Sequence, residues 1–131
     1  MMKKMMKVCL CFAFMMCLAG CQKESKKLAY DEAEVLAKGE AIIMELNAGK
    51  YQEALDRGTK EIKVIGDQVQ AGMEEYVIPL GAFQKIDEHE IVASEESITL
   101  GIIAIYEKGN IQYTFAFDKD GVMTGIWMKQ V

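Results

Sequence analysis

The last third of the chain alternates apolar and polar side chains with a period of two, the pattern of strands with one buried face. Residues 98–107 are rich in β-branched apolar residues, which stand at odd as well as even positions of the strand. Residues 111–117 carry Ile, Tyr and Phe at every second position. Segments 108–110 and 118–121 contain glycine, which can supply positive φ, and predict hairpin turns. The pattern therefore predicts a four-stranded antiparallel meander of residues 86–93, 98–107, 111–117 and 122–128.

The same alternation assigns side chains to the two faces of this sheet. One face takes the large residues of both central strands and is expected to form the core. The other face keeps an apolar patch, and exposed patches of this kind usually mark interfaces. We therefore predict a homodimer or a partner contact through a set of residues on this second face: Ile103, Ile105, Ala116, Met123 and Trp127.

Helical periodicity precedes the strands. Asp31 and Glu34 resemble a capping box, an apolar stripe recurs at helical spacing from residue 35 to residue 46, and Gly49 is a natural left-handed stop. A short helix is expected over 51–58. Residues 62–65 fit either a strand or a helical turn, and Asp67 can cap a third helix that ends near Pro79. The chain is thus predicted to be an α+β domain, with two to three helices packed on a curved four-stranded antiparallel sheet.

The amino terminus has the layout of a secretory signal. Residues 1–7 carry three lysines, residues 8–18 are an uncharged run of eleven, and Leu18-Ala19-Gly20-Cys21 follows. The run is shorter than the roughly 20 residues of a spanning helix. Small residues directly before a cysteine resemble the lipobox of bacterial lipoproteins, which implies a diacylglyceryl group on Cys21. Ordinary secretory cleavage is the alternative.

These features predict a signal peptide over 1–20, a membrane-proximal tether over 21–29 and a single domain over 30–131. Loss of residues 1–20 leaves 12 basic and 20 acidic residues, a formal charge of −8, which argues against nucleic-acid binding. Three of the four cysteines lie in the signal and Cys21 takes the lipid, so no disulfide is expected. We expect an extracytoplasmic protein held on the bacterial cell membrane by lipid on Cys21.

Three motifs carry residues typical of catalysis or metal binding, and each has a plainer interpretation. Asp118-Lys119-Asp120-Gly121 resembles the start of a calcium loop, but Lys129 stands where the loop needs its distal glutamate, which favours a hairpin turn. His89 shares a strand face with Asp87, and a solvated strand is favoured over a weak metal site. The serines form no arrangement with His89 that predicts a triad. No cofactor is expected.

Three stretches resemble the domain-of-unknown-function 3887 family: Asn47-Ala48-Gly49-Lys50-Tyr51, Leu80-Gly81-Ala82-Phe83 and Phe117-Asp118-x-Asp120-Gly121-x-x-x-Gly125-Ile126. The resemblance covers about residues 35–128. It implies a cystatin-like or nuclear-transport-factor-2-like fold in a secreted or lipidated bacterial protein, sometimes placed before an α/β-hydrolase domain. The chain has no GxSxG elbow, so hydrolase activity is not carried over. The resemblance implies no catalytic residues.

Folds of this class often enclose a cone-shaped cavity between helices and sheet. Its candidate wall residues are aromatic or soft side chains: Tyr51, Tyr76, Tyr113, Phe115 and Met128. A filled core is the alternative. We therefore expect first a non-enzymatic binding domain that contacts itself or an envelope protein, and second a small-molecule carrier or sensor. A ketosteroid-isomerase-like enzyme ranks last, because its chemistry needs a carboxylate inside the pocket and the predicted inward faces carry none.

Overall fold

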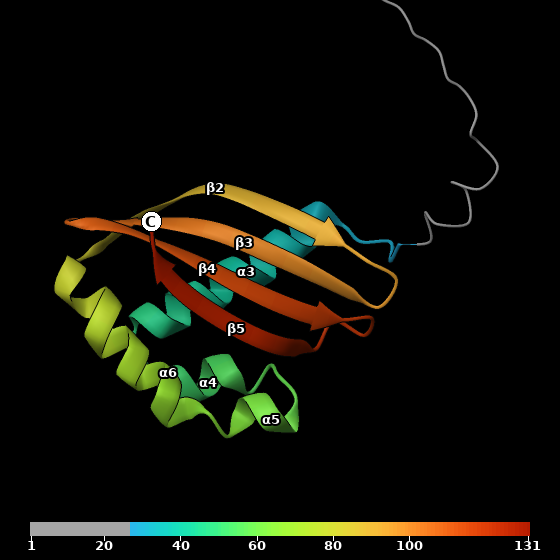
Figure 1. Ribbon diagram of the computed structural model, residues 1–131, viewed down its shortest axis with the longest axis horizontal. Helices are drawn as coiled ribbons and strands as arrows, with labels where there is room; N and C mark the ends of the chain where they lie inside the picture. The colour runs from blue at the N-terminus through green and yellow to red at the C-terminus, as the bar shows by residue number, and fades with distance from the viewer. Residues whose placement is uncertain (1–26) are drawn as a thin grey trace, which may run out of the picture.

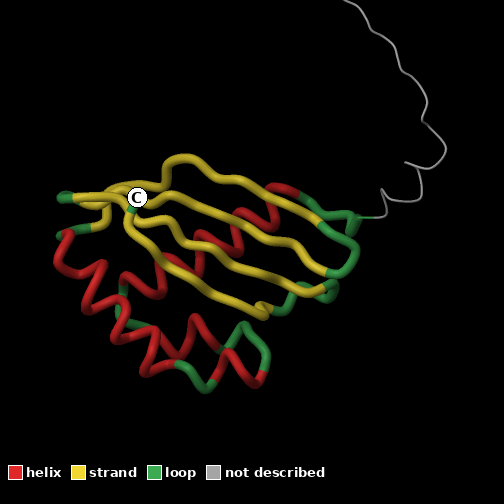
Figure 2. The backbone as a smooth tube through the Cα atoms, in the orientation of Figure 1, coloured by secondary structure: helices red, strands yellow, loops and turns green. Residues whose placement is uncertain are grey.

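The computed structural model describes residues 27–131, and the predicted signal peptide and Cys21 lie outside the described residues. Helices come first and strands follow (Figures 1 and 2). The helical elements are α3 (Glu32–Asn47), α4 (Tyr51–Leu55), α5 (Lys60–Lys63), α6 (Gly66–Gly72), a π-helical turn η1 (Met73–Val77) and a 3-10 turn η2 (Ile78–Leu80). The strands are β2 (Phe83–Ala93), β3 (Ser97–Tyr106), β4 (Gly109–Asp118) and β5 (Met123–Gln130).

The four strands form one antiparallel sheet in the order β2-β3-β4-β5. In Figure 1 α3 lies behind this curved sheet, so the view is onto the opposite face, and α4, α5 and α6 lie beyond the β5 edge. The predicted α+β class with a curved antiparallel meander is confirmed. The helical part is divided more finely than the predicted two to three helices: α5 ends at Lys63 before α6 begins at Gly66, and the turns between α6 and Gly81 are π-helical and 3-10.

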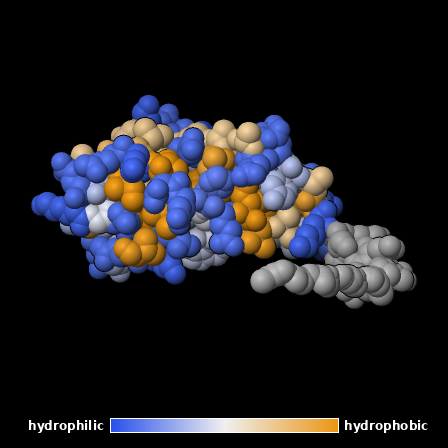
Figure 3. Space-filling model, turned by 90° about the horizontal axis from the view of Figure 1, so that it is seen from above, coloured by the Kyte–Doolittle hydropathy of each residue, from blue (hydrophilic) through white to orange (hydrophobic). Residues whose placement is uncertain are grey.

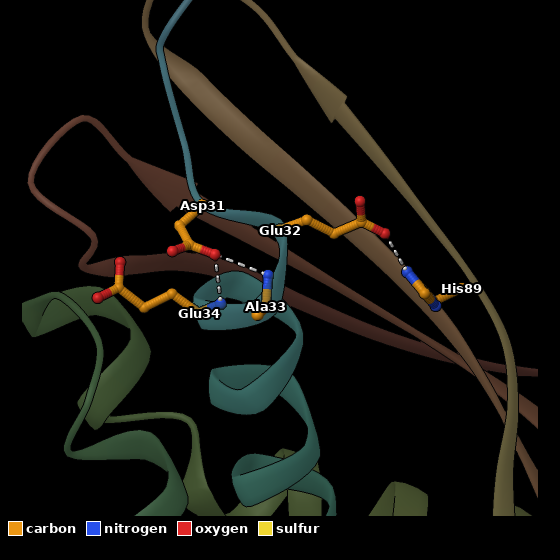
Figure 4. Close-up of polar contacts among 5 residues, drawn as sticks. All are labelled: Asp31, Glu32, Ala33, Glu34 and His89. Carbon is orange, nitrogen blue, oxygen red and sulfur yellow. Dashed lines mark hydrogen bonds and ion pairs between the residues drawn. The ribbon is translucent and has the colours of Figure 1, made fainter.

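Local chemistry sets both ends of α3. The Asp31 carboxylate accepts hydrogen bonds from the backbone N–H groups of Ala33 (2.9 Å) and Glu34 (3.3 Å), as Figure 4 shows. The side chain of the next residue, Glu32, extends across to His89 on β2 and pairs with it. The helix ends before Gly49, whose φ of 78° is the left-handed stop that the sequence predicts.

The core lies between α3 and one face of the sheet, called here the inner face. Ile42, Ile43 and Leu46 of α3 are fully or almost fully buried against it. The alternation correctly predicts most of the buried side chains of β3 and β4, and Tyr106 is a further one that it did not predict. The predicted ones are Ile98, Leu100, Ile102, Ala104, Ile111, Tyr113, Phe115 and Phe117. At about 25 cal/mol per Å² of apolar area removed from water, burial of these residues is the main force that holds the domain together.

Gly39 lets α3 come close to the sheet. A Cβ at this position would overlap Cδ2 of Leu100 and lie 2.9 Å from Cδ1 of Ile102. Lys38, the neighbouring residue, holds the helix to the β4–β5 turn: its Nζ donates to the Gly121 carbonyl (3.2 Å) and lies 5.2 Å from the ring centroid of Phe117.

Two local predictions are wrong. Asp67 lies in the first turn of α6 and does not cap it, because the helix begins one residue earlier at Gly66. Gly109 does not supply a positive φ to the β3–β4 hairpin: Tyr106 pairs with Gly109, so the turn is Glu107-Lys108. Gly109 opens β4 instead, close to Leu80, whose Cδ2 would lie 3.1 Å from a Cβ there. The β4–β5 turn is as predicted, with Gly121 at φ 83°.

Met123 is the third correction. Strict alternation puts Met123 with Trp127 on the exposed face, but Met123 is fully buried in the core. The cause is a register shift: Ala116 pairs with Gly125, whereas Phe117 pairs with Met123, so Thr124 is extra in β5. One inserted residue turns the side chain before it to the other face of the sheet.

The described residues begin near the end of the sheet that carries the β2–β3 and β4–β5 turns, and the chain enters the domain there (Figure 2). Leu28 donates its backbone N–H to the Ser94 carbonyl (2.7 Å) and packs against the core. Seven residue steps separate Leu28 from Cys21, a reach of at most about 25 Å when fully extended. Among residues 27–131, each helix is too short or too polar to cross a lipid bilayer.

The close approach at Gly39 predicts a specific loss of stability. Gly39→Val should lower the free energy of unfolding by about 1–3 kcal/mol, because the new side chain meets Leu100 and Ile102. Ala37→Val, at an exposed position of the same helix, is the control and should cost less than about 1 kcal/mol. Urea denaturation measures both, and equal stabilities of the two variants would contradict a tight helix–sheet contact.

Candidate functional site

The face of the sheet turned away from α3 is called here the outer face, and strand register defines its residues. Residues opposite one another on neighbouring strands share a face, so the outer face consists of rows that cross the sheet. One row joins Glu90, Gly101, Thr114 and Trp127; the next joins Ile103, Gln112 and Lys129; another joins Val92, Thr99, Ala116 and Gly125.

Trp127 is the most prominent apolar side chain of the outer face. It is 57% exposed although it stands in the middle of β5. Its indole lies across Gly125, where a Cβ would overlap the ring. Because Gly125 has no side chain, the indole can lie against the strand there, and it presents apolar surface to solvent.

A hollow opens on the same face, on the side of β2. Gly101 has no side chain to fill it: a Cβ there would meet nothing nearer than Nε2 of Gln112, at 3.7 Å. The hollow has a volume of about 350 Å³, and its rim is acidic because β2 contributes two glutamates. The residues that line this Gly101 hollow are Glu88, His89, Glu90, Gly101, Ile103 and Gln112.

Four of the five predicted interface residues share the outer face. Ile103, Ile105 and Ala116 are half-buried on this face, which also carries the exposed Trp127, whereas Met123 belongs to the core. The sequence did not predict the Gly101 hollow. A glycine within an apolar strand was the available signal, since it often marks a place where another group approaches closely.

The edge of the sheet at β2 is more polar than its centre. Figure 3 views the molecule from above Figure 1, where β2 is the upper edge of the sheet, and shows hydrophobic surface interrupted by hydrophilic side chains. Register irregularities within β2 separate Phe83 from Lys85 and Ile86 from His89, so Asp87 and Glu88 together stand opposite Ile103. Charges and bulges on an edge strand discourage pairing with further strands.

A second candidate site is a cleft at the end of the domain opposite the chain entrance. Its volume is about 650 Å³. It lies where α3 ends and β2 begins, and aromatic rings supply part of its wall. The residues that line it are Leu46, Asn47, Ala48, Gly49, Tyr51, Met73, Val77, Ile78, Gly81, Ala82, Phe83 and Tyr106.

A chain of hydrogen bonds closes the floor of this cleft. Tyr106 donates to Oδ1 of Asn47 (2.8 Å), and the hydroxyl oxygens of Tyr106 and Tyr113 are 2.6 Å apart. Since the single Tyr106 proton goes to Asn47, Tyr113 donates to Tyr106. Burial raises the pKa of Tyr113, and its contact with Tyr106 raises it further; burial also raises the pKa of Tyr106. Both hydroxyls therefore stay protonated at neutral pH.

The predicted pocket residues do not share one wall. Tyr51 lines the cleft, whereas Tyr113 and Phe115 are fully buried and fill the core beneath it. Tyr76 and Met128 line a separate hollow of about 310 Å³ with Lys129 and Gln130. The sequence predicted an aromatic pocket but did not identify Asn47, Phe83 or Tyr106 as residues that line it. These residues come together because of the path that the chain takes from η2 into β2.

The two residues weighed for metal binding have protein partners. His89 Nε2 lies 2.9 Å from the Glu32 carboxylate and so joins β2 to the first turn of α3; it does not pair with Asp87, because of the bulge. Asp118 Oδ1 accepts from the backbone N–H groups of Asp120 (2.9 Å) and Val122 (3.0 Å). Its carboxylate thus stabilises the hairpin turn that the sequence favours.

Comparison with known proteins supports the fold alone. No protein-family model matches the chain, and no curated protein matches it. An NMR structure of a protein from Ruminococcus gnavus ATCC 29149 is similar, with a TM-score of 0.64 at 20% sequence identity over 79% of this chain and 96% of that chain. The resemblance to the domain-of-unknown-function 3887 family stays a prediction.

The raised pKa of Tyr113 predicts a loss of stability in alkali. The folded state holds this proton more tightly than the unfolded state, so the stabilisation is complete below about pH 10 and is lost at higher pH, by up to about 1.4 kcal/mol per pH unit. Tyr113→Phe should therefore lose less stability than the unaltered protein between about pH 9 and about pH 11.5. Thermal unfolding measures this, with the exposed Tyr30→Phe as control; equal losses in Tyr113→Phe and Tyr30→Phe would contradict the assignment.

Proposed function

We propose that this protein is a lipid-anchored, extracytoplasmic binding domain that acts through its outer face, by self-association or by contact with an envelope protein. The observation that carries the proposal is the exposed indole of Trp127, on the same face of the sheet as Ile103, Ile105 and the Gly101 hollow. Tryptophan is enriched among the residues that dominate binding energy at interfaces. The centre of this face is uncharged, which suits a surface that becomes covered.

The anchored arrangement has support from both sequence and structure. The lipobox-like motif predicts lipid on Cys21, and the bond from Leu28 to Ser94 would start the domain within about 25 Å of that lipid. The end where the chain enters is acidic, because it carries the start of α3 and both turns; its acidic residues are Asp31, Glu32, Glu34, Glu95, Glu96, Asp118 and Asp120. Repulsion between this end and anionic headgroups would keep the domain off the bilayer surface, within the reach of its tether.

A second candidate function is carriage of a small molecule, and the 650 Å³ cleft favours it. The polar groups on its floor already bond to one another, since Tyr113, Tyr106 and Asn47 form one chain and Nδ2 of Asn47 donates to the Ile43 carbonyl (3.0 Å). A ligand would thus be held mainly by apolar and aromatic contact. For the same reason we propose a non-enzymatic role, since these groups are neither acidic nor free to move protons at neutral pH.

The lipid anchor is tested at its sulfur. Cys21→Ser should leave the chain uncleaved or mislocalised and without acyl mass, because serine cannot form the thioether. Cys17→Ser, within the predicted signal, is the matched control and should be processed normally. Mass spectrometry and membrane fractionation of expressing bacteria measure both. Normal cleavage and membrane retention of Cys21→Ser would contradict the anchor.

The outer face is tested by photo-crosslinking in intact bacterial membranes. A photoreactive phenylalanine analogue at Trp127 should give a light-dependent adduct with a defined envelope protein or with the protein itself. The same analogue at Val64, which is 78% exposed on the helical side, should not give that adduct. Identical adducts from both positions, or none from Trp127, would contradict a role for the outer face.

A further inference from the structure

We propose that the partner of the outer face is a second copy of this chain, with Trp127 of each copy seated in the Gly101 hollow of the other. The inference rests on the proposed function and names its partner. It follows from the position of one projection and one hollow on the same face of the same sheet.

Strand register places the projection and the hollow in one row. Glu90, Gly101, Thr114 and Trp127 stand opposite one another across β2, β3, β4 and β5. Neighbouring strands are about 4.8 Å apart, so Trp127 on β5 is about 10 Å from Gly101 on β3, on the other side of the middle of the sheet. The backbone of Trp127 and the hollow therefore lie at nearly the same level along the strands, on opposite sides of the centre. The indole itself lies over Gly125, in the neighbouring row, so it has to turn away from Gly125 to enter the hollow of the other copy.

A twofold axis that runs along the strands, over the middle of the sheet, makes this arrangement self-complementary. Such an axis keeps the level along the strands and exchanges the two edges, so β5 of one copy lies over β2 of the other, on the β2 side of the Gly101 hollow. The indole of each copy then meets the hollow of the other in an isologous contact. Strands of two sheets packed face to face commonly run within about 30° of each other, which this axis permits.

Charge on the outer face agrees with the same axis. Lys129 on β5 belongs to the row of Ile103 and Gln112, and the bulge puts Glu88 of β2 at the opposite end of that row. Exchange of the edges therefore brings Lys129 of one copy to Glu88 of the other, on both sides of the axis. The central strands contribute no charge to these rows, so a chain with a predicted charge of −8 meets its copy where repulsion is least.

The position of the anchor is an independent argument. Leu28 is bonded to the β2–β3 turn, so the lipid side of the domain is one end of the strands. An axis along the strands leaves this end of both copies on the same side, and both anchors can enter one bilayer. An axis across the strands would put the two anchors at opposite ends. Tethering on one surface also raises the effective concentration of the second copy.

The experiment measures the mass of a soluble version that begins at Gln22, by sedimentation equilibrium up to about 1 mM, a concentration that tethering can supply. The unaltered protein should reach the mass of a dimer. Trp127→Glu removes the projection and Gly101→Leu fills the hollow, and each should raise the dissociation constant at least about tenfold. Val64→Glu is the matched control and should leave it unchanged. Since a Cβ at Gly101 has room, that variant should keep the circular-dichroism spectrum and melting temperature of the parent.

Exchange of the two charges tests the axis itself. Lys129→Glu should weaken the dimer, because it sets two carboxylates against each other, and adding Glu88→Lys should restore the original dissociation constant. Restoration supports the axis along the strands, and its failure overturns it.

The outcome also separates this inference from the proposed function. A soluble domain that stays monomeric throughout, or a dimer that tolerates both Trp127→Glu and Gly101→Leu, overturns the second copy as partner. If Trp127 nevertheless crosslinks to a different envelope protein in membranes, the proposed function stands. If it gives no specific adduct, both are overturned.

Discussion

Close contact between α3 and β3 is the constraint on which the rest of this domain depends. Gly39 provides it, because any side chain there would meet Leu100 and Ile102. With the helix against the sheet, Ile42, Ile43 and Leu46 cover the inner face and the core closes without a disulfide among residues 27–131. An α3 held farther away would leave voids under these side chains, and such voids are costly in a domain of this size.

The same contact decides which face of the sheet stays uncovered. Helix α3 covers the inner face, and the short helices beyond β5 add buried side chains such as Met73 to the same core. No helix of the described residues covers the outer face. Trp127 and the Gly101 hollow stand on that face, while the floor of the distal cleft is closed by bonded tyrosines. The fold itself permits many functions. Because the fold alone does not define a function, the proposed function rests on the outer face of the sheet.

Much of the fold follows from the sequence, because burial on one side of a strand imposes a period of two. Most of the buried residues of β3 and β4 were predicted, as were the Asp31 cap and the left-handed Gly49 and Gly121. The errors arise where one residue changes the register. Thr124 in β5 turned Met123 inward, and the β2 bulge moved His89 toward Glu32. Alternation cannot predict such insertions, since they depend on the pairing of the neighbouring strand.

The candidate site was predictable only in part for the same reason. Alternation identified Trp127, Ile103 and Ile105. It could not identify the Gly101 hollow, because the hollow depends on which residues of three neighbouring strands surround the position where Gly101 lacks a side chain. Trp127 is the single tryptophan of the chain, so its fluorescence reports on the outer face alone. The most direct test is acrylamide quenching of this emission over a concentration series of the soluble domain. Quenching that falls as the protein is concentrated, with a shift of the emission to shorter wavelength, is the predicted result; constant quenching and emission up to about 1 mM would contradict a second copy on this face.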